Sequence, residues 1–275
     1  MEYTLYKSIY LKNMDWSDIM PKFFIVSDVH GFYNEMIDAL NDAGFDKYNP
    51  EHWLISCGDH VDRGPDPAAV INYLTSLPRK VLIVGNHEQL IEECCMRGFP
   101  YKADKHNGTF QTICNLGGMG LISRNFEECC DVAWKRFKPF MDSMVNYFET
   151  EHYVFCHSWI PVIRNENVPS YYHNAKKKYT KREDWRDATD EEWNESMWFD
   201  PLQMVSSGFW IEKCIVSGHW HCSTGWSYTM GVSEFGDDAI WEPYNYKDKL
   251  IMIDRCTAHT GKVNVLVIED EFLKE

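Results

Sequence analysis

The sequence lacks the features that mark membrane-embedded or disordered chains. Its longest purely aliphatic or aromatic runs, such as residues 23–26 and 265–268, are far shorter than the ~20 residues that a membrane helix requires. Glycine (16) and proline (11) fill few positions, while 44% of residues are hydrophobic and 25% are charged. These proportions exclude a disordered or collagen-like chain. With 275 residues, the chain is close to the upper size of one hydrophobic core, and we expect a single domain over residues 1–275.

Positive charge is also scarce. The 27 lysines and arginines are outnumbered by 42 aspartates and glutamates, which gives a formal net charge of −15. A surface this negative repels phosphate backbones and anionic lipid. The composition therefore disfavours nucleic acid and a membrane surface as partners.

The ten cysteines show no CxxC spacing, so a zinc ribbon has no support. The first twenty residues carry acidic and polar side chains where a secretory segment needs an unbroken apolar stretch. We therefore expect reduced thiols and a cytoplasmic protein.

Short runs rich in β-branched and aromatic residues predict buried strands at 23–27, 53–57, 81–84, 153–156, 214–217, 250–253 and 263–268. Helical spacing of apolar residues follows each of the first three runs. This βαβαβα order favours a parallel sheet whose strands bring their carboxyl ends to the same edge, where ligand sites gather.

A stretch at about 165–210 differs from the rest of the chain. It is dense in both charges and contains Trp185, Trp193 and Trp198. We interpret it as an insertion. Mixed charge is typical of a solvated helix or loop, while the tryptophans leave open a cap that packs over a cleft.

Polar residues of metal-ligand type follow five of the predicted strands. The sets are Asp28 with His30, then Asp59, then Asn86, then His157, then His219 with His221. The intervals from 28 to 59 and from 59 to 86 match the ~30 residues of a βαβ unit, so successive strands would bring these side chains next to one another.

These donors indicate a particular kind of metal centre. Carboxylate, imidazole and one amide oxygen suit Mn, Fe or Zn rather than calcium. Their number exceeds one four-coordinate ion and favours two ions roughly 3.5 to 4 Å apart, with the Asp59 carboxylate as the bridge. Such a pair favours hydrolysis of phosphoesters.

Three neighbouring residues complete a catalytic hypothesis. Arg63 offers a planar guanidinium for bidentate contact with phosphate. His87 follows the donor Asn86 and is a candidate proton donor to the departing oxygen, with Asp62 fixing its tautomer. Glu88 is expected to be a first-turn helix carboxylate and not a ligand.

These motifs resemble the signature of the calcineurin-like metallophosphoesterase superfamily, which is D-x-H, GDxxDRG, GNH[DE], a lone histidine and GHxH. They stand here as DVHG, GDHVDRG, GNHE, CHS and GHWH, within residues 24–221. The resemblance implies an α/β fold of four αββα layers, a sandwich of mostly parallel strands flanked by helices. Residues 253–269 are similar to the closing hairpin of that family.

The resemblance also implies roles for the site residues. The implied metal ligands are Asp28, His30 and His221 for the first ion, Asp59 as the bridge, and Asn86, His157 and His219 for the second. Arg63 would contact phosphate, and His87, supported by Asp62, would be the acid. The cofactors would be two divalent or trivalent transition-metal ions.

GDxxDRG together with GNHE is typical of the branch that holds serine/threonine protein phosphatases and diadenosine tetraphosphatases. We expect a phosphoester hydrolase that uses a metal-bound hydroxide, with phosphoserine or phosphothreonine in proteins as the first substrate and a dinucleoside polyphosphate as the alternative. A different kind of protein, an inactive phosphate-binding scaffold, would show a lost ligand or acid, and none is lost.

Overall fold

The computed structural model describes residues 20–118, 125–165, 167–168, 175–233, 235, 238–246 and 248–273. Within these residues, no helix combines the length and the hydrophobicity needed to cross a bilayer. All ten cysteines fall in the described ranges and are free thiols, as expected.

The first of two four-stranded sheets has the order β10-β1-β2-β3. β1 pairs in parallel with β2, and β2 with β3, whereas β10 pairs antiparallel with β1. Its strands are β1 (Lys22–Val26), β2 (His52–Ser56), β3 (Lys80–Leu82) and β10 (Leu266–Glu269).

The second sheet has the order β4-β5-β8-β9. β5 pairs in parallel with β8, and β8 with β9, whereas β4 is antiparallel to β5. Its strands are β4 (Tyr147–Glu149), β5 (Tyr153–Cys156), β8 (Cys214–Ser217) and β9 (Leu250–Met252). The expected mixture of mostly parallel strands is confirmed.

Alternation along the strands explains why two sheets stack. In β1, Phe23 and Ile25 belong to the apolar cluster shared by both sheets, whereas Phe24 and Val26 belong to the cluster shared with helices. In the second sheet, Phe155 likewise faces the other sheet. Both faces of these strands are thus buried, which is why the sequence shows unbroken hydrophobic runs instead of alternation.

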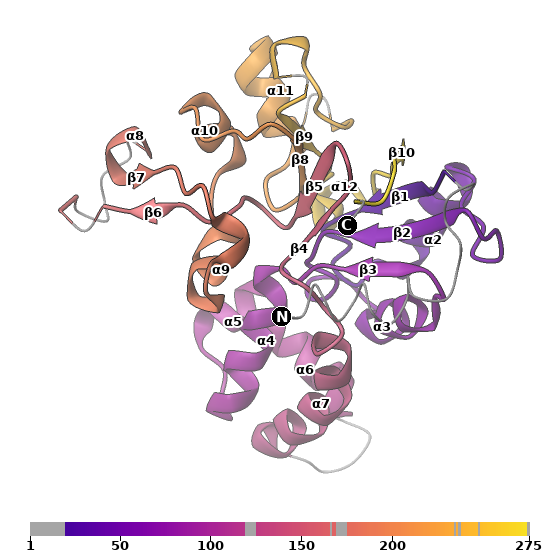
Figure 1. The fold of residues 1–275 in the computed structure, drawn as a ribbon. Helices are drawn as coiled ribbons and strands as arrows, with labels where there is room; N and C mark the ends of the chain where they lie inside the picture. The colour runs from indigo at the N-terminus through magenta and orange to yellow at the C-terminus, as the bar shows by residue number, and fades with distance from the viewer. Residues whose placement is uncertain are drawn as a thin grey trace.

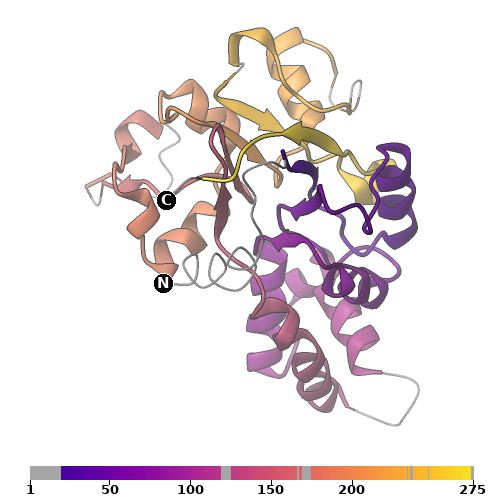
Figure 2. The same ribbon diagram turned by 45° about the vertical axis from the view of Figure 1, so that its right-hand side comes forward.

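Helices cover the outer face of each sheet, and the four-layer αββα prediction is confirmed (Figures 1 and 2). The cluster on the first sheet takes in α2 (Tyr33–Asp42), α3 (Pro67–Ser76), α4 (Asn86–Arg97), α6 (Thr109–Gly117) and α7 (Phe126–Met141), with the short α5 (Lys102–Asn107) before α6. The apolar cluster on the outer face of the second sheet contains residues of α8 (Ala175–Lys178), α9 (Asp190–Ser196), α10 (Pro201–Ser206) and α11 (Cys222–Met230).

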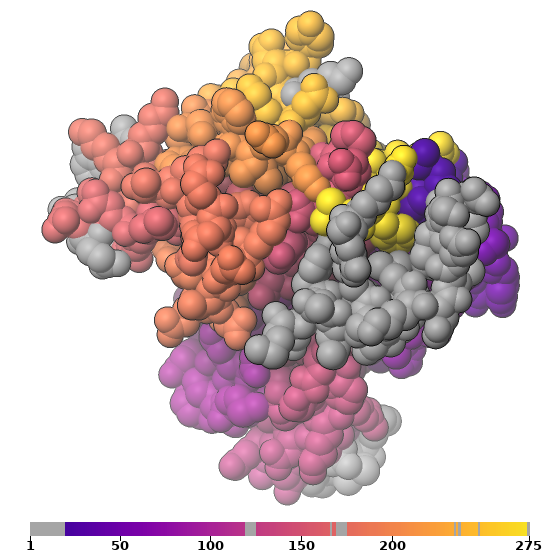
Figure 3. Space-filling model, viewed as in Figure 1, coloured from indigo at the N-terminus to yellow at the C-terminus, as the bar shows by residue number. Residues whose placement is uncertain are grey.

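The charged stretch at about 165–210 packs on the second sheet through its aromatic residues. Trp185 and Trp193 are buried in that cluster, while Trp198 is 51% exposed. A two-stranded sheet of β6 (Ile163–Arg164) and β7 (Tyr179–Thr180) extends from the same region (Figure 1). In Figure 3 these elements form the left part of the visible surface.

The predicted closing hairpin is wrong. β9 lies in the second sheet and β10 in the first, and α12 (Thr257–Thr260) lies on the connection between them. The physical reason is that one edge of β1 needs a hydrogen-bonding partner. Without β10 this strand would present unpaired backbone groups to solvent, and an antiparallel partner satisfies them.

Candidate metal centre

The donors predicted from the sequence lie at the carboxyl ends of strands from both sheets. Asp28 and His30 follow β1, Asp59 follows β2, and Asn86 is the first residue of α4, after β3. His157 and His219 follow β5 and β8 in the second sheet. All but His219 are at most 3% exposed, so these polar groups are buried and need partners.

Backbone strain is concentrated at the same place. Nine non-glycine residues of the described chain have positive φ, and six of them are candidate site residues: Asp28, His30, Asp59, Asp62, Arg63 and His219. Each such conformation costs of order 1–3 kcal/mol and persists only where the surroundings enforce it. The strands thus end in turns that aim side chains inward at a cost in stability.

Two glycines allow the strand ends to approach each other. A Cβ on Gly58, which has φ of +90°, would lie 2.6 Å from His157 Nδ1 and 2.8 Å from the Gly85 Cα. A Cβ on Gly218 would lie 2.1 Å from Asp28 Oδ2. Any larger residue at either position would push donors of the two sheets apart.

Asp59 belongs to two groups of potential metal ligands, one with His30 and His87 and the other with His157 and His219. Its Oδ2 lies 3.8 Å from Nε2 of both His30 and His87. Its Oδ1 lies 3.5 Å from His157 Nε2. Two ligands of one ion at ~2.0–2.2 Å are roughly 3–3.5 Å apart, so the distance to His157 fits shared coordination, while the 3.8 Å distances are longer.

The histidine tautomers also suit a cation. Nδ1 of His30 donates to the Val61 carbonyl at 2.9 Å, and Nδ1 of His157 donates to the Cys57 carbonyl at 2.8 Å. In a neutral ring each Nε2 is then an acceptor. His157 Nε2 faces the Asn86 Oδ1 at 2.8 Å, a contact of two lone pairs that a bound cation would satisfy.

Burial keeps two of these histidines uncharged. It lowers the pKa of His30 well below its usual value, and the neighbouring His87 adds to this effect. Burial, followed by the proximity of His157, lowers the pKa of His219 to about 3. Neutral imidazole is the form that binds metals.

Acidic groups carry excess negative charge into the centre. Asp28 Oδ2 accepts hydrogen bonds from Ser27 Oγ at 2.6 Å and from the His219 amide at 2.9 Å. Burial and the charge of Asp59 nevertheless raise the pKa of Asp28 to about 6. Asp254, 2% exposed, has its pKa raised well above normal by burial and by the charge of Asp28. Cations would relieve this repulsion.

A hydrogen-bonded pair lies on one side of the centre. His87 Nδ1 is 2.8 Å from Asp62 Oδ2, which also accepts from Thr109 Oγ1 at 2.6 Å. Burial alone lowers the pKa of His87, but the charge of Asp59 and the bond to Asp62 outweigh it, so this pKa is raised. The ring is thus held with Nε2 toward the centre, and its surroundings stabilise the protonated form relative to a free imidazole.

Arg63 lies against the same histidines. Its Nη1 is 2.7 Å from His30 Nε2 and its Nη2 is 3.0 Å from His87 Nε2. A guanidinium at this position offers its donors to an anion entering the centre.

Glu88 has a role beyond the expected first-turn carboxylate of α4. It is fully buried and accepts hydrogen bonds from the backbone amides of Gly85, Asp59 and His60 at 2.8, 3.0 and 2.9 Å. The sequence reasoning missed this function, as it missed Thr109 and Asp254. The spacing of residues 59 and 88 does not reveal which backbone amides a side chain will meet.

Among the described residues, the two ligand groups do not include Asp28, and they do not include His221. Nε2 of His221 is 3.9 Å from Asp254 Oδ2, and its ring centroid is 5.9 Å from that of Phe235. At the other flank the exposed Trp198 packs edge-on against His219, with centroids 5.9 Å apart. The assignment of His221 to a metal, like that of the other predicted ligands, stays a prediction.

The fold and this donor set are typical of metal-dependent phosphoesterases. Comparison with known proteins supports this class. The family model described as calcineurin-like phosphoesterase matches residues 21–223. The chain belongs to the calcineurin-like phosphoesterase family. The resemblance drawn from the motifs is thus confirmed.

Two curated relatives are similar over a short segment. The symmetrical bis(5'-nucleosyl)-tetraphosphatase of Edwardsiella ictaluri (strain 93-146) is 45% identical over 65 residues, which are 23% of this chain and 23% of that protein. The protein of the same name from Proteus mirabilis (strain HI4320) is 39% identical over 66 residues, 24% of this chain and 23% of that protein. The chain therefore matches less than a quarter of the length of each relative.

A solved structure of a cold-active protein tyrosine phosphatase is similar over a longer range. The TM-score is 0.55 at 16% identity, and the alignment covers 91% of this chain and 74% of that chain. At this identity the likeness concerns the fold alone.

Proposed function

We propose that this protein is a phosphohydrolase with two transition-metal ions, and that its substrate is a dinucleoside polyphosphate. The observation that carries the proposal is the position of Asp59, whose carboxylate is grouped with His30 on one side and with His157 and His219 on the other. Asp28 and His30 would hold the first ion, with His221 as a further ligand of that ion. Asn86, His157 and His219 would hold the second.

The donor chemistry supports Mn, Fe or Zn, because imidazoles, carboxylates and one amide are combined. When bound, a pair of such ions polarises phosphoryl oxygens and activates water for in-line attack. The protein's own contribution is to keep the imidazoles of His30 and His219 neutral and the carboxylates close, with most of the donors buried.

The remaining roles belong to three side chains. Arg63 would hold phosphate oxygens through its two terminal nitrogens, which already point at the centre. His87 would donate the proton on Nε2 to the departing oxygen. Asp62 supports this role because it fixes the opposite nitrogen and helps to raise the pKa of His87.

The choice of substrate reverses the order expected from the sequence. The two named relatives are symmetrical tetraphosphatases and align with this chain at 39–45% identity, although over a short segment. A protein phosphatase has the support only of a fold likeness at 16% identity. An inactive scaffold is disfavoured because every expected donor and the acid are present.

A substrate panel tests the proposal. With Mn²⁺ present, we expect kcat/KM for diadenosine tetraphosphate to exceed that for a phosphothreonine peptide, with adenosine diphosphate as the product. Asp59→Asn should lose at least about 10²-fold activity on every substrate, whereas the exposed Asp38→Asn should match the wild type. Preference for the peptide would contradict the substrate, and full activity of Asp59→Asn would contradict the metal-based mechanism.

A further inference from the structure

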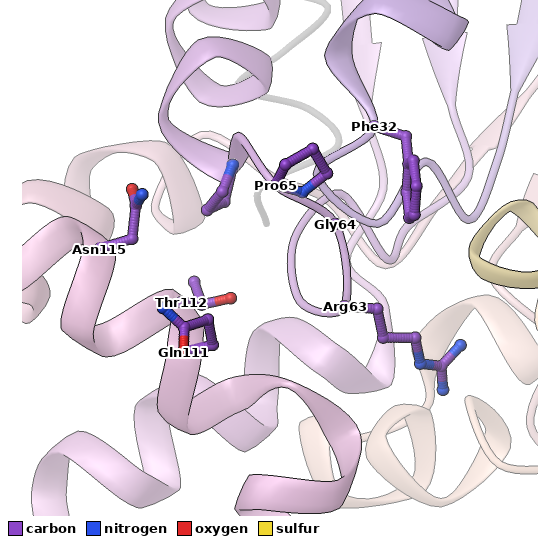
Figure 4. Close-up of a pocket in the computed structure, with 8 residues that line it drawn as sticks. Phe32, Arg63, Gly64, Pro65, Gln111, Thr112 and Asn115 are labelled. Atoms are coloured by element: carbon purple, nitrogen blue, oxygen red, sulfur yellow. The ribbon is translucent and has the colours of Figure 1, made fainter. Parts of the chain in front are cut away.

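A pocket of about 430 Å³ shares Arg63 with the candidate metal centre, and Figure 4 shows its lining. One wall comes from α6 and the other from the turns that follow β1 and β2. Its lining residues are Phe32, Arg63, Gly64, Pro65, Pro67, Gln111, Thr112 and Asn115. The volume is within the range of small-molecule sites.

The α6 wall presents two amide side chains. Gln111 and Asn115 are four positions apart on the helix and therefore lie on the same face. Both residues are exposed, and neither side chain has a hydrogen-bond partner among the residues that the structure describes. Thr112, between them, is buried and uses its hydroxyl to accept from the Asp62 amide at 3.1 Å. The two amides are thus available to a ligand.

The opposite wall is apolar. Phe32, Pro65 and Pro67 offer flat hydrocarbon surfaces, and Figure 4 shows Phe32 and Pro65 across the pocket from Asn115. A ligand that fits between these walls has a flat apolar face and an edge with hydrogen-bond donors and acceptors. A nucleobase has this combination, because it stacks on rings and its edge pairs with side-chain amides.

Charge and position connect the pocket to the centre. The lining contains no carboxylate and one cation, although the whole chain has a formal charge of −15. The cation is Arg63, whose guanidinium extends away from α6 in Figure 4 and contacts His30 and His87. A molecule bound in the pocket is therefore next to Arg63, whose guanidinium reaches the histidines of the centre.

We propose that this pocket is a nucleoside subsite, a proposal that rests on the function proposed above. It holds one base of a dinucleoside polyphosphate between the apolar wall and the amides of Gln111 and Asn115. Each side-chain amide offers both a donor and an acceptor, which is the combination that the edge of a nucleobase pairs with. The polyphosphate runs past Arg63 to the reacting position.

The test uses Gln111→Ala, Asn115→Ala and the double variant, with the exposed Asn41→Ala on α2 as the matched control. The ratio of kcat/KM for diadenosine tetraphosphate to that for p-nitrophenyl phosphate should fall about tenfold in the double variant. The fall should appear mainly in KM for the dinucleotide. The control should keep the wild-type ratio.

Calorimetric binding separates this proposal from the proposed substrate. Adenosine diphosphate should bind the double variant about tenfold more weakly than the wild type, while pyrophosphate binds both alike. If wild-type protein does not hydrolyse diadenosine tetraphosphate but shows this pattern, the substrate is wrong and the subsite stands. An unchanged affinity for adenosine diphosphate, or an equal loss for pyrophosphate, overturns the subsite.

Discussion

At the scale of single residues, Glu88 connects the two halves of the candidate centre. Its carboxylate joins Asp59, in the turn after β2, to Gly85, which precedes Asn86 at the start of α4. Burial by itself raises the pKa of Glu88, but the nearby His60 and the backbone donors outweigh it and hold this pKa at about 2. Since Asp59 has φ of +55°, the backbone hydrogen bond to Glu88 helps to keep a strained residue in place.

Replacement of Glu88 should therefore weaken the fold and the metal site together. We expect Glu88→Ala to lower the free energy of unfolding by about 3–5 kcal/mol, because buried donors lose their partner. Glu88→Gln, which keeps an acceptor, should lose about 1–3 kcal/mol. Urea unfolding measures the change, and Mn²⁺ titration should show weaker binding in both variants. The exposed Glu93→Gln of the same helix is the control, and equal stability of all three variants would refute this role.

The sequence was sufficient to predict that residues after different strands would lie near one another, for a physical reason. Asp28, Asp59 and Asn86 follow parallel strands of one sheet, and parallel strands bring their carboxyl ends to one edge. The sequence was not sufficient for Glu88 or Asp254. Their importance depends on which groups they meet in the folded chain, and no periodicity encodes that.

At the scale of elements, ion pairs attach the charged stretch to the second sheet. Glu149 of β4 is 3% exposed and contacts Arg186, after Trp185, and Lys213, before β8. Burial alone raises the pKa of Glu149, but the hydrogen bonds and charges of Arg186 and Lys213 outweigh it, so this pKa is lowered. The interaction therefore contributes stability above the usual glutamate pKa, and this contribution is lost as the pH falls through the lower pKa of the folded state.

Glu149→Gln should consequently destabilise the protein in a pH-dependent way. At pH 7 we expect a loss of about 1–3 kcal/mol in the free energy of unfolding, because two charged partners lose their acceptor. The difference from the wild type should shrink as the pH falls below about 4.5. There the glutamate of the unfolded wild type takes up a proton while that of the folded protein is still ionised, which favours unfolding. Urea unfolding at several pH values measures it, with the exposed Glu151→Gln as control. A difference that grows toward acid would contradict the assignment.

Strands that are buried on both faces were predicted to within a few residues, since their hydrophobic runs are unbroken. The three-residue β4 and the two-residue β6 and β7 were missed because so short a segment has no detectable period. The pairing of β10 was also mispredicted. A hydrophobic run indicates a strand but not the sheet that it joins.

At the scale of the whole molecule, the sandwich explains why donors from distant segments can meet. The first sheet contributes Asp28, Asp59 and, through α4, Asn86, and the second contributes His157 and His219. The apolar cluster between the sheets fixes their relative position, so the site depends on the integrity of both layers. The family and its four layers followed from the ordered motifs, whereas the pocket beside Arg63 could not, because α6 carries none of the motifs.

The central claim is that these donors form a centre for two ions bridged by Asp59. Metal analysis of protein purified without chelator and supplied with Mn²⁺, compared with Asp59→Asn at equal concentration, tests it most directly. The account predicts close to two ions per wild-type chain and about one or fewer in a folded Asp59→Asn variant. A folded wild-type protein that binds no metal, or a variant that still binds two ions, would contradict it.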